Sequence, residues 1–372
     1  MLRGFILFLI AASLLIAGET CLFQLATPQL GSAYWLIPIF GYIPILLGGL
    51  FKKFPIIRVA AFTFILLKIA IAPFLLLGAF YNLPIFYILA IVIGLFLSLA
   101  FIHGLTRGQY LYQVTETILH FDDLPPAFDG YRFAQISDIH AGTFDNPEKV
   151  AKGIAKINAL NPDLIVFTGD LVNYHPSEIE PYYGVFDKLE APDGVLSVLG
   201  NHDYYQSNFV DKTQENVYEF FKEQHRQTGF ELLLDEHREI IKENQSIYIL
   251  GVQNWGDPPF PQIGDLGKAA VGVPDNDFKI LLSHDPTHWS RKVLSFSQKI
   301  HLTLSGHTHA MQFGINWGKI RWSPVSLRYK HWMGLYEEAG KYLYVNRGFG
   351  CLAFPGRVGM FPEISLFELR RK

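Results

Sequence analysis

Two histidines one residue apart, His307 and His309, follow a short apolar run in the segment LTLSGHTH (302–309). Side chains two positions apart in an extended strand point the same way, so two neutral imidazoles there can face one metal ion. The same pair can equally be two polar residues of a loop. The pair therefore raises the question of whether other parts of the chain supply further ligands in the same kind of place.

Four other apolar runs also end in carboxylate, amide or imidazole side chains. These are Asp138 and His140 in ISDIH, Asp170 in FTGD, Asn201, His202 and Asp203 in LGNHD, and His284 in LSHDP. Taken alone, Asp138 suits a helix cap and Asn201 suits a turn. In open α/β sheets, however, the ligand crevice lies outside the carboxyl ends of the strands. We therefore expect these side chains, from five parts of the chain, to converge.

The candidate ligands outnumber what one tetrahedral ion needs, and they are all oxygen or nitrogen donors. They are Asp138, His140, Asp170, Asn201, His284, His307 and His309. This number fits two ions that share a bridging carboxylate, an arrangement that clamps a phosphoryl oxygen while a metal-bridging hydroxide attacks in line. The two cysteines, Cys21 and Cys351, contribute no thiolate ligand to this set. Two divalent metal ions, manganese, iron or zinc, are therefore expected as cofactors.

The elements that position these residues alternate between strand and helix patterns. The segments 131–140, 163–170, 194–203, 246–255, 278–286 and 300–309 are predicted strands, and 146–162, 181–192 and 217–225 are predicted helices. This alternation indicates an α/β domain with at least part of its sheet parallel. A hairpin that turns at Ala339–Gly340 makes the sheet mixed.

The N-terminal third has a different composition. Half of all residues are hydrophobic and only 17% are charged, and the excess lies in the apolar runs Leu2–Ala17, Ala33–Phe51, Ile56–Tyr81 and Pro84–His103. The last three reach the length of about 17 to 25 residues that crosses a bilayer, whereas the first is short and also resembles a signal peptide. We expect an all-α transmembrane region of about four helices (1–105), a linker (106–130) and a second domain (131–372).

Charge predicts the side of the membrane and the kinds of partner. Lys52, Lys53 and Arg58 lie between the second and third runs, and Arg107 follows the fourth. The positive-inside rule therefore predicts an integral, multi-pass membrane protein whose second domain is cytoplasmic. A net charge of −3 gives no support for a nucleic-acid partner. No protein partner is inferred.

The motifs DIH, GD, GNHD, H and GHTH, in this order from Tyr131 to the C-terminus, resemble the calcineurin-like metallophosphoesterases. The details SDIHAG, NRGFG and PEIS resemble the bacterial membrane-associated branch, some of whose members cleave the pyrophosphate of UDP-diacylglucosamine. The resemblance implies that 131–372 is a metallophosphoesterase domain, a sandwich of two mixed sheets flanked by helices, preceded here by the transmembrane region.

The resemblance also implies roles for individual residues. One metal is held by Asp138, His140 and His309, the other by Asn201, His284 and His307, and Asp170 bridges them. His202 is expected to protonate the leaving oxygen. Asp203 either orients His202 or bonds to the local backbone. Arg347 and Arg357 are candidates for gripping a non-bridging phosphate oxygen, with a structural ion pair as the alternative.

We therefore expect a membrane-anchored phosphoesterase that hydrolyses a phosphodiester or pyrophosphate. A lipid-linked substrate is the leading candidate, because membrane tethering suits it and because FGCLAFPGRVGMF (349–361) is rich in apolar residues, which suit either an acyl chain or the protein core. The alternative is a catalytically silent metal-binding sensor or regulatory module at the membrane. A transporter with a soluble appendage has little support, since no pair of broken apolar helices is visible.

Overall fold

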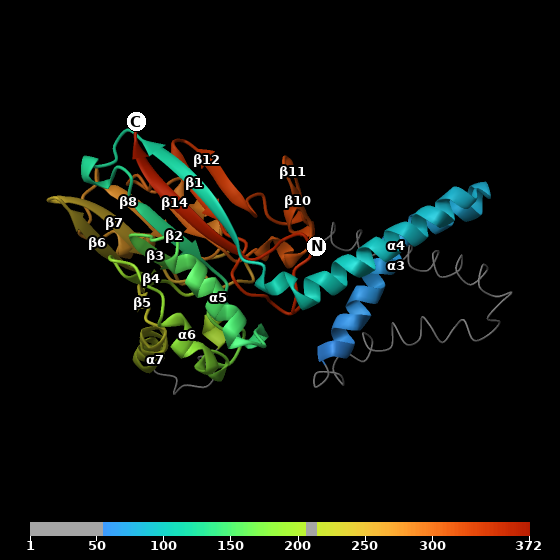
Figure 1. Ribbon diagram of the computed structural model, residues 1–372. Coiled ribbons are helices and arrows are strands. Elements are labelled where there is room, and N and C mark those ends of the chain that lie inside the picture. Colours follow the sequence, from blue (N-terminus) through green and yellow to red (C-terminus); the bar gives the residue numbers. More distant parts are fainter. Residues whose placement is uncertain (1–54, 206–213) are drawn as a thin grey trace. The chain divides into compact units, whose positions relative to one another are not determined.

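The computed structural model of the protein describes residues 55–205 and 214–372 (Figure 1). The chain divides into two compact units, Met1–His103 and Gly104–Lys372. The first two apolar runs, Leu2–Ala17 and Ala33–Phe51, lie outside the described residues.

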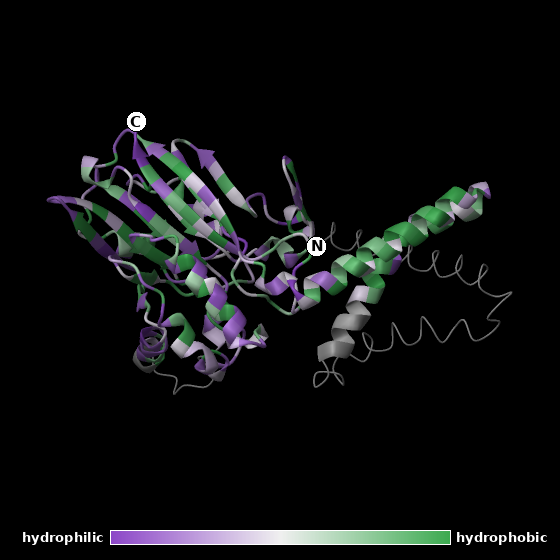
Figure 2. Cartoon of the chain, in the orientation of Figure 1, coloured by the Kyte–Doolittle hydropathy of each residue, from purple (hydrophilic) through white to green (hydrophobic). Residues whose placement is uncertain are grey.

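Two apolar helices precede the second unit. α3 spans Pro55–Tyr81 and α4 spans Pro84–Thr106. Both are long and apolar enough to cross a membrane, over Thr63–Tyr81 and Pro84–Thr106. Figure 2 shows α4 as hydrophobic along most of its length. Only a small share of either span is buried within the structure, whereas the core helix of a soluble protein buries most of its apolar side chains.

The first sheet of the second unit has the strand order β1-β14-β2-β3-β4-β5. Its strands are β1 (Gln113–Phe121), β14 (Glu363–Arg371), β2 (Arg132–Ile136), β3 (Leu164–Phe167), β4 (Val195–Ser197) and β5 (Glu231–Leu232). Strands β2 to β5 are parallel, and β14 runs antiparallel to β2 but parallel to β1. The sheet is therefore mixed.

The second sheet has the order β12-β13-β9-β8-β7-β6. Its strands are β12 (Gly334–Glu338), β13 (Lys341–Val345), β9 (Leu302–Ser305), β8 (Phe278–Leu282), β7 (Gln245–Gly251) and β6 (Glu236–Lys242). The four inner strands are parallel and both edge pairs are antiparallel. The β12–β13 hairpin turns at Ala339 and Gly340, both with positive φ, as expected.

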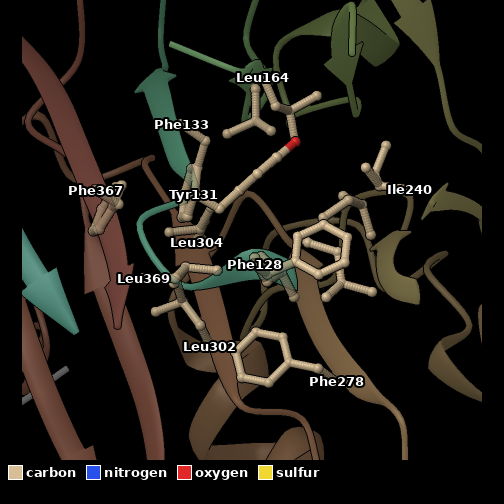
Figure 3. Close-up of a cluster of buried hydrophobic side chains, with 14 of the residues drawn as sticks. Phe128, Tyr131, Phe133, Leu164, Ile240, Phe278, Leu302, Leu304, Phe367 and Leu369 are labelled. Atoms are coloured by element: carbon tan, nitrogen blue, oxygen red, sulfur yellow. The ribbon is translucent and has the colours of Figure 1, made fainter. Parts of the chain in front are cut away.

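The two sheets pack face to face through apolar side chains. Phe133 and Val166 of the first sheet share a buried cluster with Ile280 and Leu304 of the second (Figure 3 draws part of this cluster). Helix α5 (Pro147–Asn158) covers the outer face of the first sheet, and α8 (Leu266–Ala269) packs on the second. The short helix α6 (Tyr183–Phe186) and α7 (Gln214–Gln227) complete the helical cover. The expected sandwich of two mixed sheets flanked by helices is thus confirmed.

The segment 106–130, which we expected to be a linker, instead contains strand β1. All nine residues of β1 pair with β14, which the chain reaches only at its C-terminus. Leu119 and Phe121 alternate into the core, while Glu116 and His120 stay exposed. A strand that depends on so distant a partner has too little local signal to be recognised.

Acid stability of this fold is expected to depend on His225 of α7. Burial lowers the pKa of His225 to about 3, from its ordinary value of 6.5. In the unfolded chain the imidazole of His225 is therefore protonated near pH 6.5, whereas in the folded chain it is protonated only near pH 3. Stability from this group is present above pH 6.5 and is lost as the pH falls between these values, by several kcal/mol in total.

The variant His225→Phe should lose less of its free energy of unfolding than the wild type as the pH falls. Two neighbouring rings, those of Phe167 and Phe230, make the site aromatic, and Ser197 keeps its hydrogen bond to the Glu231 carbonyl. Chemical unfolding of the full chain in detergent at several pH values measures the effect, with the exposed His120→Gln as control. An unchanged pH slope in His225→Phe would contradict the assignment.

Candidate metal centre

Seven side chains meet beyond the carboxyl ends of five strands. They are Asp138 and His140 after β2, Asp170 after β3, Asn201 after β4, His284 after β8, and His307 and His309 after β9. Potential ligand atoms of Asp138, His140 and His309 lie within 4.8 Å of one another, and those of Asp170, His284 and His307 do the same. Side chains from distant parts of the sequence thus gather in two adjoining groups.

In the first group, the side-chain nitrogens face one another. Nε2 of His140 lies 3.0 Å from Nε2 of His309, and the latter lies 3.1 Å from Oδ1 of Asp138. All three side chains are buried.

In the second group, Nδ1 of His307 lies 2.8 Å from Oδ1 of Asn201 and 3.2 Å from Nε2 of His284. Asn201 therefore belongs to this group by distance. Its amide oxygen, rather than a charged atom, faces the imidazoles.

Asp170 lies between the two groups. Its Oδ2 is 3.4 Å from Nε2 of His140 and 3.2 Å from Nε2 of His284. Its Oδ1 accepts a hydrogen bond of 2.7 Å from the backbone N–H of His202. One carboxylate oxygen is thus shared between an imidazole of each group, which is the position a bridging ligand occupies.

The residues present fit divalent cations. Nitrogen and oxygen ligands lie about 2.0–2.2 Å from such ions, so neighbouring ligands of one ion are about 3.0–3.5 Å apart. The nitrogen–nitrogen and nitrogen–oxygen distances in both groups fall in or near this range. Two imidazole nitrogens this close have no reason to approach unless a proton or a cation lies between them. Imidazole and carboxylate without thiolate suit manganese, iron or zinc.

The far sides of the His284 and His307 imidazoles are held by protein groups, which fixes the orientations of these two rings. Nδ1 of His284 lies 2.8 Å from the carbonyl of Thr168. Nε2 of His307 lies 2.9 Å from the Tyr329 hydroxyl and 3.3 Å from Oδ2 of Asp285. His284 can therefore donate its Nδ1–H and keep the Nε2 lone pair for a cation.

Burial and charge set the protonation states. Burial lowers the pKa of His140 to about 3 despite the nearby Asp170, so its imidazole is neutral. Burial raises the pKa of Asp170, but His284 and other imidazoles outweigh this effect and hold it well below its usual range. For His284, the attraction of Asp170 exceeds the effect of burial and raises the pKa to about 10. A cation that binds here must displace the proton of His284.

Five of the seven side chains extend from backbone in the left-handed region. These are Asp138, His140, Asp170, His307 and His309. Such conformations cost about 1–3 kcal/mol each and persist only where the surroundings hold them. Backbone hydrogen bonds do so here, from the N–H of Asp138 to Gly169 and from the N–H of His140 to Asp170. Strain of this kind clusters at functional sites.

Glycines allow the strand ends to approach one another. A Cβ at Gly306 would overlap Oγ of Ser137 and Oδ2 of Asp138. Gly169 has a φ of +94°, and a Cβ there would lie 2.5 Å from the Gly200 nitrogen. The sequence motifs that carry the candidate ligands therefore need glycine for steric reasons.

Asp203 does not orient His202 but holds the loops of the site. Its fully buried carboxylate accepts hydrogen bonds from the backbone N–H groups of Asp170 (3.0 Å), Leu171 (2.8 Å) and Gly200 (2.8 Å). Burial and the nearby Asp170 raise its pKa to about 7. Asp203 therefore bonds to backbone, as in the second alternative, but two of these three donors belong to the loop after β3 and only Gly200 is local.

The variant Asp203→Asn should destabilise the domain by about 2–5 kcal/mol. Asparagine has one acceptor oxygen, and its NH₂ group would face backbone N–H donors. At least one buried N–H group would then lose its acceptor, which costs about 1–3 kcal/mol, and the facing donors would also repel each other. Chemical unfolding of the full chain in detergent measures the loss. The exposed Asp187→Asn is the matched control, and equal stability of the two variants would refute this role.

His202 lies beside both groups. Its Nδ1 is 2.8 Å from the carbonyl of Asn173, and its ring centroid is 4.9 Å from that of His140. The imidazole is half-buried, with the rings of Tyr174 and Tyr205 next to it. Because Nδ1–H donates to the carbonyl, Nε2 remains for another partner. Asn173, through its backbone, takes the orienting role that the sequence suggested for Asp203.

Arg347 and Arg357 are both buried, and their contacts run to protein groups. Arg357 is fully buried and donates to the carbonyls of Gly350, Met360 and Arg347. Its Nη2 also lies 3.3 Å from Nδ1 of His309. Arg347 is 3% exposed and pairs with Glu363 at 3.0 Å. Arg347 thus forms the ion pair that was the alternative, whereas Arg357 bonds to backbone carbonyls and forms no ion pair among the described residues.

Sequence reasoning missed two groups behind His307. Asp285 directly follows His284 in the chain, so its position was visible although its contact was not. Tyr329 belongs to none of the sequence motifs, and only the fold brings its hydroxyl next to His307.

Comparison with known proteins agrees with this architecture. Residues 131–311 match the family described as calcineurin-like phosphoesterase. The chain is 29% identical over 268 residues to the uncharacterized metallophosphoesterase YkuE of Bacillus subtilis, which covers 70% of this chain and 86% of that protein. It is also similar to proteins named "transmembrane protein with metallophosphoesterase domain". In Danio rerio the identity is 27% and in Bos taurus 29%, and each alignment covers 76% of this chain and 62% of the relative.

The chain thus spans less than two thirds of the length of these vertebrate relatives. The family match begins at Tyr131, at the start of β2, and includes all seven side chains of the two groups. The fold, the strand-end motifs and the matches to known sequences lead to one conclusion: residues 131–311 of this chain carry a calcineurin-like phosphoesterase domain.

Proposed function

We propose that the protein is a membrane-anchored hydrolase that uses two divalent cations to cleave a phosphodiester or a pyrophosphate. The observation that carries the proposal is the pair of buried ligand groups on either side of Asp170. A single structural ion would need only one of these groups.

In this proposal, Asp138, His140 and His309 hold one cation, Asn201, His284 and His307 hold the other, and Asp170 is shared. Such a pair of cations polarises a phosphoryl oxygen and lowers the pKa of water. Buried imidazoles with anchored far sides keep the ligand atoms in place, as His284 does through Thr168.

His202 is proposed to donate a proton to the leaving oxygen. Its Nδ1 is occupied by the Asn173 carbonyl, so proton transfer would use Nε2. The half-buried position next to His140 leaves the ring reachable for a substrate. Proton transfer by a positioned histidine contributes about a hundredfold to ten-thousandfold to such reactions.

We further propose a lipid-linked substrate and a multi-pass membrane anchor with the phosphoesterase domain in the cytoplasm. The support is the apolar helices α3 and α4, the names of the vertebrate relatives, and the Lys and Arg residues that flank the apolar runs. Enzymes that act on lipids gain from confinement to the surface that holds their substrate.

The test uses the full chain, purified in detergent and loaded with manganese. Hydrolysis of bis-p-nitrophenyl phosphate should occur, should stop with EDTA and should return with added manganese. A parallel screen of phospholipids and nucleotide-linked lipids addresses the substrate class. Cation binding without hydrolysis of any of these compounds would favour the sensor module instead.

A further inference from the structure

A small hairpin stands apart from both sheets. Within the described part of the chain, β10 (Ile315–Trp317) and β11 (Ile320–Trp322) pair only with each other, and Figure 1 shows them projecting from the domain. The register places Ile315 opposite Trp322, and Trp317 opposite Ile320. Because directly opposed residues share a face of the ribbon and alternate residues do too, these four side chains form one face. Asn316 and Arg321 form the other.

The apolar face of the hairpin is exposed. The exposed fractions are 50% for Ile315, 81% for Trp317, 60% for Ile320 and 47% for Trp322. Two-stranded hairpins are marginally stable in water unless a further layer covers them. Contiguous exposed apolar surface of this kind marks an interaction site.

The charges around this face are positive. Lys319 lies in the turn and Arg321 on the opposite face, and no Asp or Glu occurs between residues 286 and 336. Tryptophan and aliphatic side chains beside Lys and Arg have the composition of segments that bind at the lipid headgroup level. The charged ends of the Lys319 and Arg321 side chains would lie toward anionic lipid headgroups, which attract them.

We propose that the apolar face of the β10–β11 hairpin inserts into the interfacial layer of a lipid bilayer.

The base of the hairpin lies beside the point at which the chain enters the domain. The N–H of Gly314 donates to the carbonyl of Val358, and the N–H of Arg357 donates to the carbonyl of Gly104. A Cβ on Gly104 would lie 2.6 Å from the Val358 side chain. Gly104 belongs to the last turn of α4, whose sequence is apolar enough to cross a membrane. The base of the hairpin is therefore held next to Gly104, the first residue of the second unit.

The hairpin is also tied to the candidate metal centre. Oγ of Ser323, which follows β11, donates to the carbonyl of Ala310 at 2.7 Å. Ala310 directly follows His309, and Thr308 donates through Oγ1 to the carbonyl of Trp332. Insertion of the hairpin would thus fix the centre close to the headgroup layer. This consequence, which favours a lipid phosphoester as substrate, rests on the proposed function, whereas the membrane contact itself does not.

The test measures whether lipids reach the two tryptophans. The full chain is reconstituted into vesicles of phosphatidylcholine and phosphatidylglycerol, with and without brominated acyl chains that quench tryptophan emission on contact. Trp317→Phe/Trp322→Phe should remove about half or more of the bromolipid-quenchable emission. Trp255→Phe, in the same domain but away from the hairpin, should leave it unchanged. Equal quenching in wild type and the double variant would overturn the proposal.

Two further measurements separate the alternatives. Lys319→Glu/Arg321→Glu should reduce the quenching in vesicles that contain phosphatidylglycerol. Strong quenching of Trp317 and Trp322 by acrylamide in the vesicles would place them in water, and shielding from both quenchers would place them against protein, such as a second copy of the chain. Either result overturns the proposal. Hydrolysis of bis-p-nitrophenyl phosphate should be unchanged in all these variants, and its absence from wild type would refute the proposed function alone.

Discussion

Replacing Asp170 by asparagine is expected to lower hydrolysis of bis-p-nitrophenyl phosphate by about a thousandfold or more. Asp170 places one carboxylate oxygen near an imidazole of each ligand group, with Oδ2 at 3.4 Å from Nε2 of His140 and 3.2 Å from Nε2 of His284. Asparagine keeps the shape but removes the charge that offsets two cations. The variant loses the shared ligand, and a cation's contribution of several kcal/mol to the barrier disappears with it.

Metal analysis of the same preparation tests the cause. Wild type should carry about two divalent cations per chain, and Asp170→Asn should carry fewer. The exposed Asp187→Asn should match wild type in both activity and metal content. Full activity in Asp170→Asn would remove the basis for a shared pair of cations. Loss of activity with a full metal complement would show that charge, rather than binding, is what Asp170 provides.

Much of the strand framework was predictable because its signals are local. β2, β3, β4, β7, β8 and β9 are short apolar runs, each buried by its neighbours. Their polar ends mark the carboxyl edge of the sheets, and that rule alone placed Asp138, Asp170 and His284 near one another. The sequence therefore predicted which strand ends meet, because parallel strands end on one side.

The elements that depend on contacts between distant residues were harder to predict from the sequence. β1 and β14 pair along nine residues although they come from opposite ends of the domain. The contacts of Arg347 and Arg357 depend on the fold, which leaves the two side chains 3% and 0% exposed and directs them to Glu363 and to backbone carbonyls. Glycines near an arginine suggest a phosphate site from sequence, whereas only packing reveals that the loop folds over these side chains.

Exposed apolar side chains also occur in a segment that the sequence analysis did not single out. We considered FGCLAFPGRVGMF (349–361) for contact with lipid, but Phe349, Cys351 and Met360 are buried. The exposed tryptophans and isoleucines belong instead to β10 and β11. Polar and apolar residues alternate in this segment over too few positions for the sequence to show whether its strands lie inside a sheet or form an isolated hairpin.

The second large effect is expected at His202. His202→Asn should slow the cleavage of a phosphodiester with an alkyl leaving group by about a hundredfold to ten-thousandfold. An alkoxide needs a proton as it leaves, whereas p-nitrophenolate leaves readily without one. The loss on bis-p-nitrophenyl phosphate should therefore be much smaller. Rates on the two substrates, measured with the same manganese-loaded preparation, give the ratio that reports proton donation.

This ratio distinguishes proton donation from a structural effect. His202 supports Asp170 through its backbone N–H, which the substitution leaves in place, so the metal content should stay at the wild-type level. The exposed His120→Gln serves as control and should change neither rate. Equal losses on both substrates, or loss of metal, would show that His202 only shapes the site. A selective loss on the alkyl substrate means that Nε2, left free because Nδ1 bonds to the Asn173 carbonyl, delivers the proton.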